Sequence, residues 1–440
     1  MAESANDAEL ERSTIHKASW RLLPMIGIGY GIAYMDRVNL SFASTTMNAD
    51  LGFSAAVYGL GGGLFFLGYS LLEVPSNLLL VRFGARRWIA RIMLTWGVIA
   101  VGMMFVRTPM QFYIMRFLLG VAEAGFFPGA IYYLTQWFPT AYRGRAISRF
   151  YIAWPLSQVV MGVVAGWLLS LQGQLGLAGW QWLFMIEGLP AVAMSVVILF
   201  LLPDAPAHAK WLTSEEKGWI SRRLAADAAA LGPRGDHNIF RALLKPTVLL
   251  FSIVNMLFLG SWYAFNLSAP ELLDQATHLG SMNVGYLIAG AGAFAAVSML
   301  ITGWTSDRTG ERYLHLAIPL ALMALSYVAL AATTNPTVVM IAYLAAVTAN
   351  GGIAAVFWLA PGELIHPRDA AVSIAAINAV GQFGSFLSPY AWGLSKDLTG
   401  GFHAGVMALP IPYLIAAGIV LVLRGQALKQ RAAKPARIVT

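Results

Sequence analysis

The sequence predicts an all-α membrane protein with twelve transmembrane helices in two pseudo-symmetric halves of six. Of its 440 residues, 58% are hydrophobic and 11% are charged, whereas soluble domains carry about 25% charged residues. Apolar runs of about 18–25 residues recur along the chain, and each is long enough to cross a bilayer as a helix. The chain has no cysteine, which excludes disulfides, thiolate metal sites and cysteine nucleophiles.

Six apolar runs lie in each half of the chain. They cover approximately residues 20–43, 56–80, 88–106, 111–137, 146–170 and 182–202, then 247–270, 283–303, 313–333, 337–361, 370–394 and 405–424. We therefore expect a tail over 1–19, a six-helix bundle over 20–202, a connector over 203–246, a second bundle over 247–424 and a tail over 425–440. The first tail lacks a short apolar core with a cleavage site, so we expect a cytoplasmic tail and not a signal peptide.

The connector contains a predicted amphipathic helix from Ser214 to Ala229. Ser214 is placed to cap its N-terminus, where Glu215 and Glu216 suit the positive end of the helix dipole. Because the charges are mixed, we expect a solvated connector; contact with lipid headgroups is the alternative.

The basic residues predict the orientation in the membrane. All of the 29 lysines and arginines except Arg37, Arg107, Arg116 and Lys396 lie on one side if both termini are cytoplasmic. Cytoplasmic loops carry the excess of basic residues, so both termini are predicted to be cytoplasmic and the protein to be multi-pass in the cell membrane, the inner membrane of a bacterium. The net charge of +8 then reflects topology and does not indicate nucleic-acid binding.

Two loops repeat between the halves. Arg82-Phe83-Gly84-Ala85-Arg86-Arg87 follows the second run, and Gly303-Trp304-Thr305-Ser306-Asp307-Arg308-Thr309-Gly310-Glu311-Arg312 follows the eighth. Arginine, glycine and arginine occur in the same order and spacing. Two related six-helix halves suggest a transporter whose site lies at their interface near the middle of the bilayer.

Six charged residues fall inside the predicted spans and away from their ends: Asp36, Arg37, Glu73, Arg116, Glu123 and Glu187. A charged residue at the bilayer centre costs roughly 2.5–3.5 kcal/mol on insertion scales, and such residues usually line a path for ions or substrates. Arg116 and Glu123 are seven residues apart, so they share a helix face. By depth, Asp36, Arg37, Arg116 and Glu123 could line one cavity. Alternatively, two buried ion pairs could hold helices together, although such pairs add little net stability.

These features resemble the major facilitator superfamily, whose loop signature is matched by Gly303 to Arg312. In the first-half copy, Asn77 and Val81 stand where glycine and aspartate are expected, which argues against a latch built on a carboxylate there. Asp307 could still serve as a latch in the second half.

More closely, the chain resembles the anion:cation symporter family, which includes sugar-acid, tartrate and phthalate carriers. The matching residues are Arg21, Pro24, Tyr34-Met35-Asp36-Arg37-Val38-Asn39, Ser41, Tyr69, Glu73-Val74-Pro75-Ser76-Asn77, Arg116 to Pro128, and Trp137-Phe138-Pro139. The resemblance implies that Asp36 and Glu123 couple transport to protons. It also implies that Arg37 and Arg116 act in anion binding and gating.

The chemistry of these residues agrees with such roles. Burial favours a protonated carboxyl and a nearby arginine favours the ionised form, while an arginine fork can bind a carboxylate through two hydrogen bonds. A substrate carboxylate that competed with Glu123 for Arg116 would therefore promote protonation of Glu123. We expect Arg116 to be the main substrate ligand and Arg37 to give electrostatic or gating support.

Further candidates are polar or aromatic. Asn378 and Gln382 lie four residues apart on the eleventh span, and Asn378 matches a family position associated with substrate. Tyr34, Tyr69 and Trp358 are further substrate candidates. We expect Glu73 to act in gating or packing. We expect latches between helices at their cytoplasmic ends, formed by Asp307, Arg308, Glu363 and Arg368. Glu187 is expected to reach water and is given no role.

The predicted function is proton-coupled uptake of a small organic anion by alternating access, with no cofactor or metal and with the monomer as the working unit. Bulky Trp154 and the apolar stretch Ala354 to Trp358 suit a hydroxy-dicarboxylate such as tartrate or an aromatic acid, with a sugar acid also open. A proton-driven exporter of organic compounds, an anion uniporter and an exchanger are alternatives within transport. No metalloprotease or nucleophile-elbow motif is evident, which argues against an enzyme. A receptor would usually carry an additional signalling domain, and none is evident in the sequence.

Overall fold

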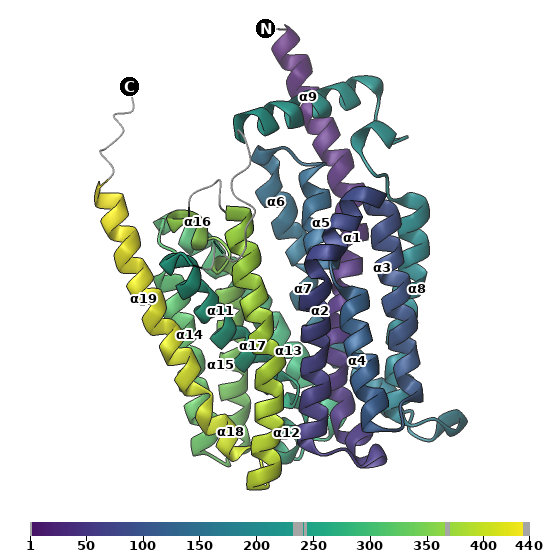
Figure 1. Cartoon of the computed structure of the whole chain (residues 1–440), viewed down its shortest axis with the longest axis vertical. Helices are drawn as coiled ribbons and strands as arrows, with labels where there is room; N and C mark the ends of the chain where they lie inside the picture. The colour runs from purple at the N-terminus through teal and green to yellow at the C-terminus, as the bar shows by residue number, and fades with distance from the viewer. Residues whose placement is uncertain (1, 232–240, 242–243, 366–369, 434–440) are drawn as a thin grey trace. The chain divides into compact units, whose positions relative to one another are not determined.

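The computed structural model describes residues 2–231, 241, 244–365 and 370–433, and these residues form helices joined by short loops (Figure 1). The chain divides into two compact units. Unit 1 comprises Met1–Asn39, Leu67–Met161 and Leu168–Arg234, and unit 2 comprises Leu40–Phe66, Gly162–Trp167 and Gly235–Thr440. Each unit is described by itself below, and the predicted boundaries of the tails, bundles and connector remain a prediction.

The helices of the first part of the chain are α1 (Ala2–Leu51), α2 (Ala55–Phe83), α3 (Ala85–Gly102), α4 (Pro109–Glu123), α5 (Phe126–Thr135), α6 (Thr140–Tyr151), α7 (Ala153–Leu169), α8 (Gly179–Leu201) and α9 (Ser214–Leu231). Short 3-10 helices occupy Met103–Phe105, Gln174–Gly176 and Pro206–His208. Those of the second part are α11 (Pro246–Asn266), α12 (Ala269–Thr277), α13 (Ser281–Thr309), α14 (Leu314–Ala332), α15 (Pro336–Val356), α16 (Pro361–Leu364), α17 (Ala370–Thr399), α18 (His403–Ala408) and α19 (Pro410–Ala433).

Ten of the twelve predicted spans correspond to candidate membrane helices of the structure. Within the described residues, ten helical segments are long and apolar enough to cross a membrane. The other two predicted spans lie in α1 and α17, which have 50 and 30 residues. Charged and polar side chains lower the hydropathy of α1, and it is in this helix that Asp36 and Arg37 lie.

Several spans predicted as continuous helices are interrupted, among them the fourth and the fifth. The fourth is divided into α4 and α5 by Gly125, which has φ 87°, a left-handed conformation that glycine adopts without steric cost. A Cβ at this position would also collide with Ser76 of α2. The fifth is divided into α6 and α7 at Ile152. The first break places Glu123 in the last turn of α4.

Small residues let helices approach closely within each unit. In unit 1, a Cβ on Gly97 of α3 would lie 2.9 Å from the carbonyl oxygen of Gly188 in α8, and a Cβ on Gly188 would lie 2.8 Å from the backbone nitrogen of Val101. In unit 2, Gly351 of α15 packs in the same way on the backbone of Ala295 in α13. Such contacts hold membrane helices together by van der Waals packing.

The connector helix is confirmed as α9, but its cap differs from the prediction. Thr213, and not Ser214, caps the helix: its hydroxyl accepts from the Glu216 backbone N–H, while the Glu216 carboxylate accepts from the Thr213 N–H. Glu216 also accepts hydrogen bonds from Lys17 at 2.8 Å and Ser13 at 2.6 Å on α1. Burial raises the pKa of Glu216, but the hydrogen bonds from Lys17, Ser13 and Thr213 outweigh it and hold the pKa below its usual value. The N-terminal part of α1 is thereby tied to α9.

Candidate functional site

Four charged side chains gather in the interior of unit 1, on α1 and α4. Asp36 and Arg116 are each 1% exposed, and Glu123 is fully buried. Arg37 and Arg116 are both close enough to Asp36 and Glu123 to act on them electrostatically. The structure therefore brings together the four residues that the sequence placed in one cavity.

Arg37 and Glu123 form an ion pair in this cluster. The Nε and Nη2 atoms of Arg37 donate to the same oxygen, Oε1 of Glu123, at 2.8 and 2.6 Å. The other carboxylate oxygen of Glu123 is buried and has no hydrogen-bond partner within the described part of the chain. Arg37, which was expected to give electrostatic or gating support, thus donates both of these bonds to Glu123, and the expected competition between a substrate and Glu123 for Arg116 stays a prediction.

Two tyrosines flank the Arg37 guanidinium. Its carbon lies 4.9 Å from the ring centre of Tyr69 on α2 and 6.0 Å from that of Tyr34 on α1. Cations are attracted to the faces of aromatic rings at such distances. The Tyr34 ring is also 5.7 Å from Trp154 on α7. Both predicted tyrosines thus lie beside the charged cluster, with Trp154 in the same aromatic wall.

Asp36 has a different environment. Its Oδ1 accepts a hydrogen bond from Asn39 Nδ2 at 3.3 Å, and its Oδ2 is buried without a hydrogen-bond partner in the described residues. Asn39 was not among the residues expected in the site, although it lies one helical turn after Asp36 and shares its face. That spacing was the signal that could have identified it.

Glu187 on α8 is placed differently from the prediction. We expected it near the outer end of its span and in contact with water, but it is 5% exposed and lies nine residues into a helix that begins at Gly179. Asp36 and Asn39 of α1 both interact with its carboxyl group. Its burial follows from the close packing of α8 on α3, which cannot be inferred from local sequence.

The polar candidates of the second half lie in unit 2. Gln382 of α17 is buried, and its Oε1 has no hydrogen-bond partner among the described residues. Asn378 and Trp358 are partly exposed, and the Trp358 ring packs edge-on against Phe357 at 5.0 Å. Their participation in substrate binding stays a prediction.

The expected gating residues have local partners. Asp307 pairs with Arg312 at 2.6 Å within the signature loop, and Arg308 lies 5.4 Å from the Trp304 ring. Glu363 pairs with Arg431 of α19 at 2.9 Å. Arg368 lies outside the described residues.

Glu73, the remaining gating candidate, is partly exposed in α2. Its backbone carbonyl accepts a hydrogen bond from Asn77 at 2.7 Å. This bond does not involve the Glu73 carboxylate, so the gating or packing role expected of that group stays a prediction.

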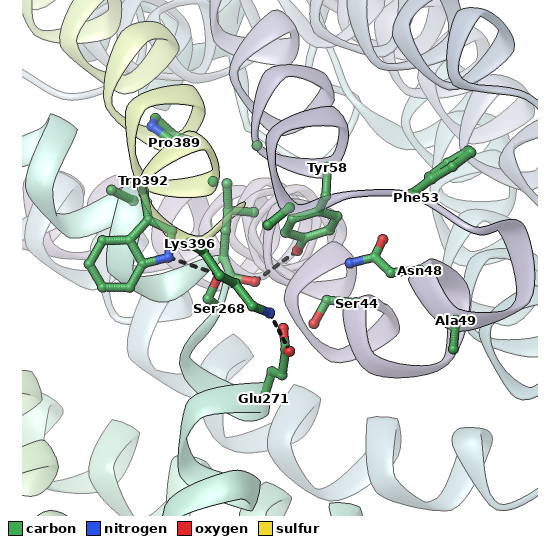
Figure 2. Close-up of a pocket in the computed structure, with 15 residues that line it drawn as sticks. Ser44, Asn48, Ala49, Phe53, Tyr58, Ser268, Glu271, Pro389, Trp392 and Lys396 are labelled. Atoms are coloured by element: carbon green, nitrogen blue, oxygen red, sulfur yellow. Dashed lines mark hydrogen bonds and ion pairs between the residues drawn. The ribbon is translucent and has the colours of Figure 1, made fainter. Parts of the chain in front are cut away.

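A separate pocket of about 290 Å³ lies in unit 2, between the Ser44–Gly59 segment and α12 and α17 (Figure 2). Lys396 pairs with Glu271 at 2.5 Å, Tyr58 donates to the Leu267 carbonyl at 2.8 Å, and Trp392 donates to Ser268 at 3.1 Å. Because the charge of Lys396 is neutralised by Glu271 in the same pocket, this pocket provides less positive charge for binding an anion than the arginine cluster does.

Sequence comparison places the chain among transporters. It matches the model of the Major Facilitator Superfamily over residues 26–389. A protein of Agrobacterium vitis with the name "Putative tartrate transporter" is 42% identical over 418 residues, which cover 94% of this chain and 92% of the relative. A quinolone resistance transporter of Acinetobacter baumannii is 40% identical, with 94% of this chain and 95% of the relative covered.

Solved structures show the same fold. A bacterial homolog of the human lysosomal transporter Spinster matches with a TM-score of 0.77 at 18% identity, over 95% of this chain and 99% of that one. The xylose transporter XylE from E. coli matches with a TM-score of 0.73 at 15% identity, over 92% and 96%. The chain is thus a multi-pass membrane protein that belongs to the Major Facilitator Superfamily of transporters.

Proposed function

We propose that this transporter is a proton-coupled symporter that takes up a small organic anion, with a hydroxy-dicarboxylate such as tartrate as the first candidate. The observation that carries the proposal is the buried cluster of two arginines and two carboxylates on α1 and α4. A cluster built for stability alone gains little from four buried charges. A cluster in which a substrate carboxylate replaces a protein carboxylate at an arginine requires these buried charges for its function.

The exchange follows from the Arg37–Glu123 pair. A substrate carboxylate that binds the Arg37 fork takes the two hydrogen bonds that Glu123 now accepts. Glu123 is fully buried, so the loss of its counter-ion favours its protonated form. Substrate binding and proton binding then favour each other, which is the linkage that symport requires. Arg116 supplies a second positive charge for a dianion.

An open groove in unit 1 supports the anionic choice. It has a volume of about 900 Å³ and runs between α1 and α6–α7, and the charged residues Arg12, Arg149 and Glu11 are among its lining residues, so basic side chains outnumber acidic ones. It also includes Met35, the residue before Asp36. Basic side chains along a concave surface raise the local concentration of anions.

Purified protein in proteoliposomes tests the proposal. An inward proton gradient should drive accumulation of radiolabelled tartrate or another small acid, and Asp36→Asn and Glu123→Gln should each abolish this accumulation. Glu215→Gln, a charge removal in the connector helix, should leave it intact. If either cluster variant keeps full gradient-driven accumulation, the coupling role of that residue is wrong. Uptake by wild type that ignores the pH gradient would favour a uniporter or exchanger.

A proton-driven exporter is the second candidate, and the quinolone resistance transporter at 40% identity supports it. Cells that express this chain would then accumulate less of a quinolone, and the purified protein would be stabilised by that compound against thermal unfolding. The anion proposal predicts stabilisation by carboxylic acids. Stabilisation by amines but not by acids would overturn it.

The positive-inside pattern further supports an inner-membrane location with both termini in the cytoplasm. The absence of cysteine makes the chain suitable for accessibility labelling of single introduced cysteines.

A further inference from the structure

Glu187 is a buried acid that the proposed exchange at Arg37 does not use. Its carboxyl group lies inside unit 1, and neither of its oxygens has a hydrogen-bond partner of good geometry within the described part of the chain. The groups that act on it are Asp36 and Asn39 of α1. One is another acid and the other is a neutral amide.

The position of Glu187 is fixed by the contact of α8 with α3. The next residue, Gly188, packs against Gly97 and Val101 with no room for a side chain. Adjacent residues of an α-helix point about 100° apart, so this contact sets the direction of the Glu187 side chain. The site is therefore part of a rigid helix pair and is not formed by a mobile loop.

An ionised carboxylate in such a place is strongly unfavourable. Burial without a counter-ion favours the neutral acid, and the neighbouring Asp36 charge adds like-charge repulsion. Asp36 is also buried and is repelled by Glu123. Unlike Glu187, it has the electrostatic support of Arg116 and Arg37, and it accepts the hydrogen bond from Asn39. Of the two acids, Glu187 is thus the one that holds a proton while Asp36 is ionised.

The amide of Asn39 has the right groups to distinguish these two states. Its Nδ2 donates to Asp36, as an amide does to an ionised carboxylate. Its Oδ1 is buried and has no partner among the described residues, so it can accept a hydrogen bond from the O–H of protonated Glu187. If the proton moved to Asp36, rotation of the amide by half a turn would present Oδ1 to Asp36 and Nδ2 to Glu187.

We propose that Glu187 is a proton-binding site that shares one proton with Asp36, with Asn39 bridging the two acids. In the exchange, the O–H bond at Glu187 breaks and an O–H bond forms at Asp36, so the negative charge moves from Asp36 to Glu187. No other bond changes. The proposal rests on proton-coupled uptake as the proposed function, and it adds a third protonatable group to that site.

Infrared spectroscopy of the purified protein tests the protonation state without transport. Wild type should show the carbonyl band of a buried protonated carboxylic acid at neutral pH, and Glu187→Gln should lose it. Glu215→Gln, which removes a carboxyl group from α9, should keep it. Retention of the whole band in Glu187→Gln would overturn the proposal, whatever the protein transports.

Uptake at different pH values tests the sharing. In Glu187→Gln the shared proton can be held only by Asp36, and no ionised Glu187 remains to favour that proton by repulsion. The midpoint of gradient-driven uptake should therefore move to lower pH by about one unit, a tenfold change in proton affinity. Glu187→Asp keeps an acid and should recover most of this shift. Asn39→Ala removes the amide that donates to ionised Asp36, so it should move the midpoint in the opposite direction, to higher pH.

The outcomes separate the two proposals. A wild type whose uptake does not depend on pH would refute the proposed function and the sharing together. A pH-dependent wild type with the same midpoint in Glu187→Gln and Asn39→Ala would refute the sharing alone. Melting temperatures of the variants show whether each has folded, and if Glu187→Gln has not, Asn39→Ala still decides the question.

Discussion

The Arg37–Glu123 pair allows a prediction in which the two partners respond differently to pH. Arg37 donates two charge-assisted hydrogen bonds to one oxygen of a fully buried carboxylate, and bonds of this type contribute about 1.5–3 kcal/mol each. Removing one partner of a buried pair costs about 3–5 kcal/mol, because the other charge is left in a medium that solvates it poorly. We therefore expect Arg37→Met and Glu123→Met each to destabilise the protein by about 3 kcal/mol at pH 8.

The pH dependence distinguishes the two variants. In Arg37→Met, Glu123 can escape the cost by taking a proton, so the destabilisation should shrink between pH 8 and pH 5. In Glu123→Met, the Arg37 guanidinium cannot lose its proton, so the destabilisation should remain. The nearby Arg116 compensates part of the charge of Glu123, which places the loss in Arg37→Met at the lower end of the range.

Thermal and denaturant unfolding in detergent at the two pH values measure these changes. The double variant Arg37→Met/Glu123→Met removes both charges and should be more stable than the sum of the single losses predicts, because an apolar replacement of a buried pair is often nearly neutral. Additive losses in the double variant would show that the pair is not coupled. Equal losses at pH 5 and pH 8 in Arg37→Met would refute the protonation argument.

Three further predictions concern other parts of the molecule. Gly97→Leu should prevent the close packing of α3 on α8 and lower the melting temperature strongly, whereas Gly27→Ala, with no atom within 4 Å of the added Cβ, should not. A cysteine that replaces Leu175, which is 87% exposed between α7 and α8, should react with an impermeant maleimide in intact cells. A cysteine that replaces Glu215 should react only after permeabilisation. The reverse result would show that the predicted topology is inverted. The lowered pKa of Glu216 predicts that its hydrogen bonds to α1 are intact above the ordinary pKa of 4.5 and are lost as pH falls through the lowered value. The protection of the α9 amides against hydrogen exchange should therefore fall at low pH in wild type. In Glu216→Gln this protection should be low already at pH 7.

The membrane helices could be predicted from the sequence because hydropathy and length are local properties. Runs of apolar residues located α2, α3, α8, α11, α13 and α14 to within a few residues. The interruption at Gly125 could not be located in this way, since it depends on a left-handed backbone and on Ser76 of another helix. The nine-residue α12 is too short to produce a hydropathy signal.

The candidate site shows the same division. Charges in apolar runs identified Asp36, Arg37, Arg116 and Glu123, because the cost of burial applies to any membrane helix. Which arginine binds which carboxylate depends on side-chain reach across two helices, and the structure selects Arg37 for Glu123.

The burial of Glu187 could not be predicted from the sequence, because it also depends on contacts between helices. Its burial results from the packing of α8 on α3, in which Gly188 and Gly97 meet although they are distant in sequence. No local pattern distinguishes such a glutamate from one at a wet helix end.

The two carboxylates of the cluster differ in their partners, and this difference implies different tasks under the proposed function. Glu123 is bound by a guanidinium that a substrate anion can also bind, so its protonation depends on whether substrate is present. Asp36 is bound by an amide that can either donate or accept, so its protonation depends on the state of its acidic neighbour. Loss of Glu123 should therefore weaken the dependence of substrate affinity on pH. Loss of Asp36 should mainly stop the gradient from driving uptake.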